Sequence, residues 1–137
     1  MKIKGTRFEI NDVELDISDS IESASAAFNS KIEKGHIEVF EETKKGKVRW
    51  LIYQHSSQPN LYLLGTVLFE KEQTGWKFWS KKEEVRRKKT QDELLKSWNI
   101  KTGNSAGMSI QNMYDPKGGF SAISVNKAYP DAAGQRR

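Results

Sequence analysis

The chain has 137 residues, carries a formal net charge of +5 and contains no cysteine. The lack of cysteine excludes disulfides, thiolate zinc sites and cysteine nucleophiles. The length is typical of one domain with one core, and 14 aromatic residues can supply large buried side chains.

The sequence shows no sign of a targeting or membrane segment. The amino-terminal residues are charged and lack the apolar run of a secretory signal. The longest strongly apolar stretch, residues 61–69, is about half of the roughly 20 residues that a helix needs to cross a bilayer. We therefore expect a cytoplasmic protein that does not enter a membrane.

The first third of the chain predicts two short strands and a helix. Residues 8–10 and 13–17 alternate apolar with acidic side chains, as in strands with one buried face. Asp19 and Glu22 have the spacing of a capping box, and apolar side chains then recur at helical spacing. We predict an amphipathic helix over residues 19–34.

The middle of the chain predicts a meander of antiparallel strands. Residues 37–42 and 48–53 alternate with a period of two on either side of a turn, which indicates a β-hairpin. Residues 61–70 are apolar at both odd and even positions, which favours a central strand covered on both faces. Residues 76–79 follow another turn and predict a fourth strand with aromatic side chains on both faces.

A second helix is expected after these strands. Thr90 and Glu93 have the spacing of a capping box, and apolar residues follow at helical spacing, so we predict a helix over residues 90–99. Ser80 and Glu83 have the same spacing. Residues 81–89 are therefore either the solvated first half of a longer helix or a charged connector.

These elements predict one α+β domain over residues 1–100. Its antiparallel sheet of four or five strands is packed by the N-terminal amphipathic helix and by a second helix after the basic residues 81–89. Residues 101–137 are rich in glycine, serine and asparagine, so we expect a C-terminal region that is loosely ordered or ordered by a partner. Within it, residues 120–125 have the pattern of one further strand.

The most distinctive feature is a basic run at residues 77–89, where seven Lys and Arg side chains outnumber two Glu side chains. The net charge of this run, +5, equals that of the whole chain, whereas residues 1–42 carry ten acidic and five basic side chains. Aromatic residues lie before and at the start of the run. We predict a partner-binding surface formed by Trp76, Trp79, Lys81, Lys82, Arg86, Arg87, Lys88 and Lys89.

Three occupants fit such a surface. Opposite charge would steer and orient an acidic protein partner. A second copy of the chain could dock through its acidic first third, which would give head-to-tail assembly. A nucleic acid could stack its bases on the tryptophans while the cations follow its phosphates. A charged run on a helix is commonly a solvated face, so we take a small protein-interaction or assembly module as the main prediction and nucleic-acid binding as the alternative.

No residue pattern indicates catalysis, a metal site or a cofactor. His36 and His55 are the only histidines, and their spacing does not match a zinc site. We expect His36 to complement the carbonyls at the end of the first helix. His55 has no nucleophile elbow beside it. The glycine-containing segments lack the patterns of nucleotide-binding loops. We therefore expect a non-enzymatic protein without a cofactor.

Overall fold

The computed structural model describes residues 1–54, 60–69, 81–105, 107–115 and 120–128. These residues form two helices and two antiparallel sheets, which is an α+β architecture. The smaller sheet has the order β1-β2-β3 and consists of β1 (Lys2–Lys4), β2 (Arg7–Ile10) and β3 (Val13–Asp16). The larger sheet has the order β4-β5-β6-β9-β8-β7 and consists of β4 (His36–Thr43), β5 (Gly46–Gln54), β6 (Leu61–Leu68), β9 (Phe120–Lys127), β8 (Met108–Asp115) and β7 (Gly103–Ser105). The helices are α1 (Ile21–Phe28) and α3 (Lys81–Ser97).

The prediction of one sheet with four or five strands is wrong, because the described strands form a six-stranded and a three-stranded sheet. The two strands predicted near the N-terminus correspond to β2 and β3, which pair with each other, and β2 also pairs with β1, so they form a separate sheet. Strand β6 pairs with β5 and β9, so a segment distant in sequence is its second neighbour. The predicted strand at residues 76–79 lies outside the described residues, and residues 120–125 lie within β9.

Strands β4 and β5 show the predicted alternation of buried and more exposed side chains, and β6, for which two covered faces were predicted, alternates as well. A two-residue turn joins β4 to β5, with Thr43 paired to Gly46 across the hairpin. Gly46 has a positive φ of 127°, a conformation that favours glycine. In β6 one set of alternating positions is buried, while Leu64 and Leu68 on the opposite face are half-buried.

Gly65 in β6 is required by the packing of the core. It lies opposite the fully buried Trp50 of β5 in the sheet register. A Cβ atom added at Gly65 would lie 2.5 Å from the Trp50 ring, closer than real Cβ contacts allow. The indole therefore lies against the backbone of β6 at the only point where a side chain is missing from that strand.

Helix α1 is shorter than the predicted helix over residues 19–34. Ser20 is the N-cap and its side chain accepts a hydrogen bond from the Ser23 N–H at 3.1 Å, whereas Asp19 accepts from the Asp16 N–H at 2.7 Å. At the other end Asn29 has a left-handed conformation with φ of 51°, which stops the helix. The chain then leaves the helix well before residue 34.

Helix α3 is longer than the predicted helix over residues 90–99, because residues 81–89 are its first half. Of the two expectations for these residues, the structure shows the longer helix and not the connector. The helix ends at Ser97; Asn99 follows with a φ of 59°, and the Ile100 N–H donates to the Leu95 carbonyl at 2.8 Å. This geometry is typical of a helix closed by a residue in the left-handed conformation.

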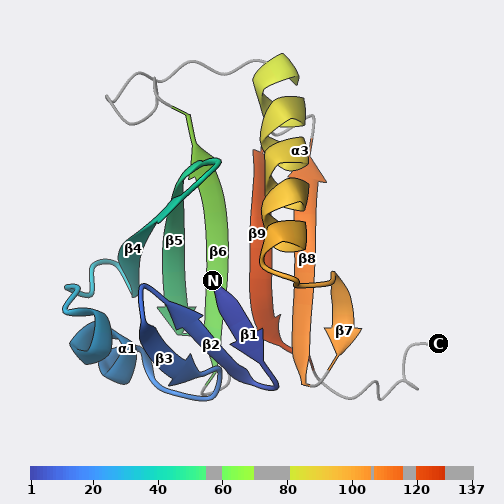
Figure 1. The fold of residues 1–137 in the computed structure, drawn as a ribbon. Helices are drawn as coiled ribbons and strands as arrows, with labels where there is room; N and C mark the ends of the chain where they lie inside the picture. The colour runs from blue at the N-terminus through green and yellow to red at the C-terminus, as the bar shows by residue number, and fades with distance from the viewer. Residues whose placement is uncertain (55–59, 70–80, 106, 116–119, 129–137) are drawn as a thin grey trace.

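The core lies on one face of the six-stranded sheet. Figure 1 shows the three-stranded sheet and α3 in front of the larger sheet, at different ends of that face. Helix α3 contacts β9, β8 and β6, and α1 contacts β4, β3 and β5. Apolar side chains from both sheets and both helices join in one buried cluster, with Phe8, Ile17, Trp50, Leu63 and Leu94 among its most buried members. The fold thus presents α3 with one face on the sheet and one face outward.

Candidate partner-binding surface

The inner face of α3 is buried against the six-stranded sheet. Arg87 is 4% exposed and Gln91 is fully buried, and both lie on the same face as the buried Leu94. Their spacing of four and three residues places all three side chains on one side of the helix. This face carries polar as well as apolar contacts, and the polar ones determine how the helix is held.

Two side chains of α3 bind the backbone of Val67 in β6. In the described part of the chain, β6 pairs with β9 from Leu63 to Gly65, so Val67 lies beyond this ladder. The Val67 N–H donates to Oε1 of Gln91 at 3.0 Å, and Nη1 of Arg87 donates to the Val67 carbonyl. Because buried backbone groups need partners, these two side chains replace the contacts that a neighbouring strand would supply.

Asn112 of β8 links the same helix to the other half of the sheet. Its Oδ1 accepts a hydrogen bond from Nε2 of Gln91 at 2.9 Å, and its Nδ2 donates to the Lys88 carbonyl at 2.9 Å and to Oδ1 of Asp92 at 2.8 Å. Gln91 therefore contacts β6 through its oxygen and β8 through its nitrogen. The helix bridges the two halves of the sheet at the point where their direct pairing is short.

The charged groups beside this network are paired. Nε of Arg87 lies 3.3 Å from Oε1 of Glu84, and both side chains are nearly fully buried. Nζ of Lys88 lies 3.0 Å from Oδ2 of Asp92. Burial alone would raise the pKa of Asp92, but hydrogen bonds from Asn112 and Lys88 outweigh it and hold that pKa below its ordinary value.

The outer face of α3 is basic. Lys82, Arg86 and Lys89 are exposed and lie at spacings of four and three residues, so they share one side of the helix; we call them the basic stripe. Arg86 lies 3.6 Å from Glu83 and its guanidinium is 4.1 Å from the centre of the Phe69 ring. In the described part of the chain, no ion-pair partner is found for Lys82 or Lys89. Val85, on the same side, is 50% exposed.

The structure divides the eight predicted site residues into three groups. Lys82, Arg86 and Lys89 are exposed, while Arg87 is buried against the sheet and the half-buried Lys88 pairs with Asp92 of the same helix. Lys81 begins α3, and its side chain is outside what the structure describes. Trp76 and Trp79 also lie outside the described residues. The structure therefore brings three of the predicted cations together on one outward surface.

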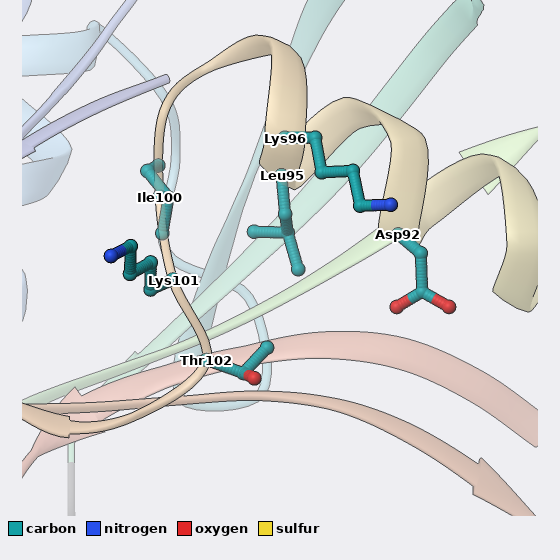
Figure 2. A pocket seen from close by; sticks show the side chains of 6 residues that line it. All are labelled: Asp92, Leu95, Lys96, Ile100, Lys101 and Thr102. Atoms are coloured by element: carbon teal, nitrogen blue, oxygen red, sulfur yellow. The ribbon is translucent and has the colours of Figure 1, made fainter.

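Two hollows flank the C-terminal half of α3. One, of about 570 Å³, lies between the helix and the β4–β5 turn and is lined by Glu42, Thr43, Lys44, Lys45, Leu94, Ser97 and Trp98. The other, of about 450 Å³, is shown in Figure 2. Its lining side chains come from the last turns of α3 and from the segment that follows: Asp92, Leu95, Lys96, Ile100, Lys101 and Thr102. Asp92 and Lys96 of this second hollow lie on successive turns of the helix.

His36 is the only histidine among the described residues. His36 is the first residue of β4, eight positions beyond the end of α1, so the expectation that it caps this helix is wrong. Its ring lies 5.3 Å from the ring of Tyr53, centre to centre. His55 lies outside the described residues. A search of the described part of the chain finds no group of three His, Cys, Asp or Glu side chains able to hold a metal ion.

The sequence analysis did not predict the roles of Gln91 and Asn112, whose hydrogen bonds hold α3 to the sheet. Gln91 does have a local signal, since it lies four positions after Arg87 and three before Leu94 on one helix face. Asn112 has none, because its partners come from a distant helix.

No described helix is long and apolar enough to cross a membrane. No family model matches the chain, and neither a curated protein nor a solved structure matches it.

Proposed function

We propose that this chain is a non-enzymatic protein-interaction module whose basic stripe contacts an acidic surface of a partner protein. The observation that carries the proposal is the difference between the two faces of α3. Its inner face is held to the sheet by Arg87, Gln91 and Asn112. Its outer face carries Lys82 and Lys89, which have no ion-pair partner in the described part of the chain.

A helix held in this way presents its cations in a fixed arrangement. Binding then loses less conformational entropy than it would with a free basic segment. Opposite charge on a partner would accelerate association and select its orientation, although each exposed pair adds little affinity by itself. Trp76 and Trp79 precede α3 in the sequence and lie outside the described residues. The proposal includes them as further contacts for the partner.

The composition of the outer face favours a protein partner over a nucleic acid. Val85 is 50% exposed and lies between the cations of the stripe. A protein partner could bury this apolar side chain, whereas a phosphate backbone offers no apolar surface to cover it. Nucleic-acid binding is the second candidate, because Lys82, Arg86 and Lys89 follow one another along about 10 Å of helix and could contact successive phosphates.

Fluorescence anisotropy with two labelled probes separates these candidates. The probes are polyglutamate and single-stranded oligo-dT, each titrated at about 50 and about 200 mM salt, a range over which multiple phosphate contacts change affinity by orders of magnitude. We expect polyglutamate to bind more tightly than the oligonucleotide. Tighter binding of the oligonucleotide would move the assignment to nucleic acid.

The variant Lys82→Gln/Arg86→Gln/Lys89→Gln tests the surface itself. We expect it to lose at least tenfold in affinity for polyglutamate. The matched control, Lys2→Gln/Lys4→Gln/Lys31→Gln, removes the same charge from exposed positions on or after β1 and α1. Equal losses in the two variants would show that net charge alone is responsible and would contradict the proposal.

A further inference from the structure

We infer that the hollow between the β4–β5 turn and the end of α3 binds an apolar side chain carried by an acidic peptide segment. This inference rests on the proposed function, since the same segment would lie along the basic stripe. We call this site the hairpin hollow; it is the 570 Å³ hollow lined by Glu42, Thr43, Lys44, Lys45, Leu94, Ser97 and Trp98.

The floor of the hairpin hollow is apolar and firmly supported. Leu94 is a fully buried member of the core, and Trp98 is half-buried. The Trp98 ring lies 6.4 Å from the ring of Trp50, centre to centre, so the core supports it from behind. The Trp98 N–H also donates to the Leu94 carbonyl at 2.9 Å, which keeps this residue in the helical turn. An apolar side chain entering here would contact a surface that is already in place.

The rim of the hairpin hollow is basic. Lys44 and Lys45 are both exposed, and in the described residues no ion-pair partner is found for Lys44. Lys45 lies 3.6 Å from Glu93. The one carboxylate of the rim, on Glu42, lies 3.5 Å from Nζ of Lys47 and is therefore compensated. The Thr43 hydroxyl donates a hydrogen bond to the Gly46 carbonyl and accepts one from the Lys45 N–H. These two bonds stabilise the turn.

The hairpin hollow adjoins the basic stripe. Glu93 lies four residues after Lys89 on the outer side of α3 and pairs with Lys45 on the rim. The distance along the helix from Lys82 to Glu93 is about 16 Å, which an extended peptide of about five residues spans. The occupant that fits is thus a short acidic segment with one aromatic or aliphatic side chain at the end that reaches the hollow.

Two synthetic peptides test this directly. One has seven glutamates and one phenylalanine, and the other has alanine in place of phenylalanine. Binding is followed by two-dimensional ¹H–¹⁵N NMR of the full chain, which reports on the Trp98 indole N–H and on the backbone of residues 43–45. We expect the phenylalanine peptide to shift these signals and to bind about tenfold more tightly, because burying a phenyl ring is worth at least that factor.

Two variants separate this inference from the proposed function. Ser97→Phe fills the hollow from an exposed position, and we expect it to abolish the advantage of the phenylalanine peptide while both peptides still bind. Ala27→Phe, also exposed but on α1, is the control and should keep the advantage. Substituting the basic stripe as above should weaken both peptides together.

Four results would overturn the inference. Equal affinity of the two peptides for the unsubstituted protein would show that the hollow takes no anchor, while leaving the basic stripe assigned. An unchanged advantage in Ser97→Phe would place the anchor elsewhere. Oligo-dT shifting the Trp98 signal more strongly than the peptide would assign the hollow to a nucleic-acid base. Failure of both peptides to bind would contradict the inference and the proposed function together.

Discussion

Arg86 and Arg87 are neighbours in sequence, yet the structure uses them in opposite ways. Arg86 is exposed on the outer face of α3 and pairs with Glu83, although both guanidinium groups lie over the ring of Phe69. Arg87 is 4% exposed, donates to the Val67 carbonyl and lies against the buried Glu84. A helix turns by about 100° per residue, so adjacent cations of a basic run point to different surroundings. The net charge of a basic run in the sequence therefore differs from the net charge that one face of the helix exposes.

The same comparison holds for the two faces of α3 as a whole. The inner face satisfies backbone groups of the sheet, so its substitution should change stability. In the described residues the outer face has few partners, so its substitution should change binding and leave the fold intact.

The largest effect is expected for Arg87→Ala. This change leaves the Glu84 carboxylate buried without its cation and removes the donor to the Val67 carbonyl. We expect a loss of about 3–5 kcal/mol in the free energy of unfolding, measured by urea denaturation. Arg86→Ala is the matched control and should cost less than about 1 kcal/mol, because its contacts are exposed.

A double variant sharpens the interpretation of Arg87. In Arg87→Met/Glu84→Gln neither buried charge remains, so part of the lost stability should return. If Arg87→Ala and Arg86→Ala were equally stable, the two faces of α3 would not differ in the way described.

Gln91→Leu should have the next largest effect. The substitution keeps the approximate volume but leaves the Val67 N–H without its acceptor and Asn112 without one of its donors. We expect a loss of about 1–3 kcal/mol, the usual cost of an unsatisfied buried polar group. Hydrogen exchange of the Val67 amide should accelerate relative to its neighbours in β6, and unchanged exchange would mean that Gln91 does not protect this group.

The smallest effect concerns the acid side of the stability profile. The pKa of Asp92 in the folded protein lies below the ordinary value of 3.8, because hydrogen bonds from Asn112 and Lys88 outweigh the effect of burial. Its contribution to stability is thus present above about pH 3.8 and is lost as the pH falls through the folded pKa. Asn112→Ala should raise the Asp92 pKa toward 3.8, which carboxyl NMR titration can measure. An unchanged pKa would show that the hydrogen bond from Asn112 does not lower the pKa of Asp92.

Much of the fold could be predicted where burial is one-sided. Strands β4 and β5 alternate in sequence because one face packs on the core, and their positions follow from that period. The end of α1 could not be predicted in the same way, since it depends on Asn29 adopting a left-handed conformation. Strand β8 has buried apolar residues only at Met108 and Ile110, so its alternation is too short to identify.

The candidate surface was predictable in part. The basic run was evident from composition. Which of its side chains point outward depends on where the helix begins, and the structure places that start at Lys81. The role of Arg87 depends on Val67 lying beyond the β6–β9 ladder, a long-range feature with no local pattern. The hairpin hollow likewise forms from residues about fifty positions apart in the chain.

Reversing the charge of the basic stripe tests the central claim most directly. The variant Lys82→Glu/Arg86→Glu/Lys89→Glu is titrated against labelled polyglutamate and labelled polylysine, and its unfolding by urea is measured on the same preparation. The account predicts a folded protein of nearly unchanged stability that has lost polyglutamate binding and has gained polylysine binding. A folded variant that still binds polyglutamate as the unsubstituted chain does would contradict it.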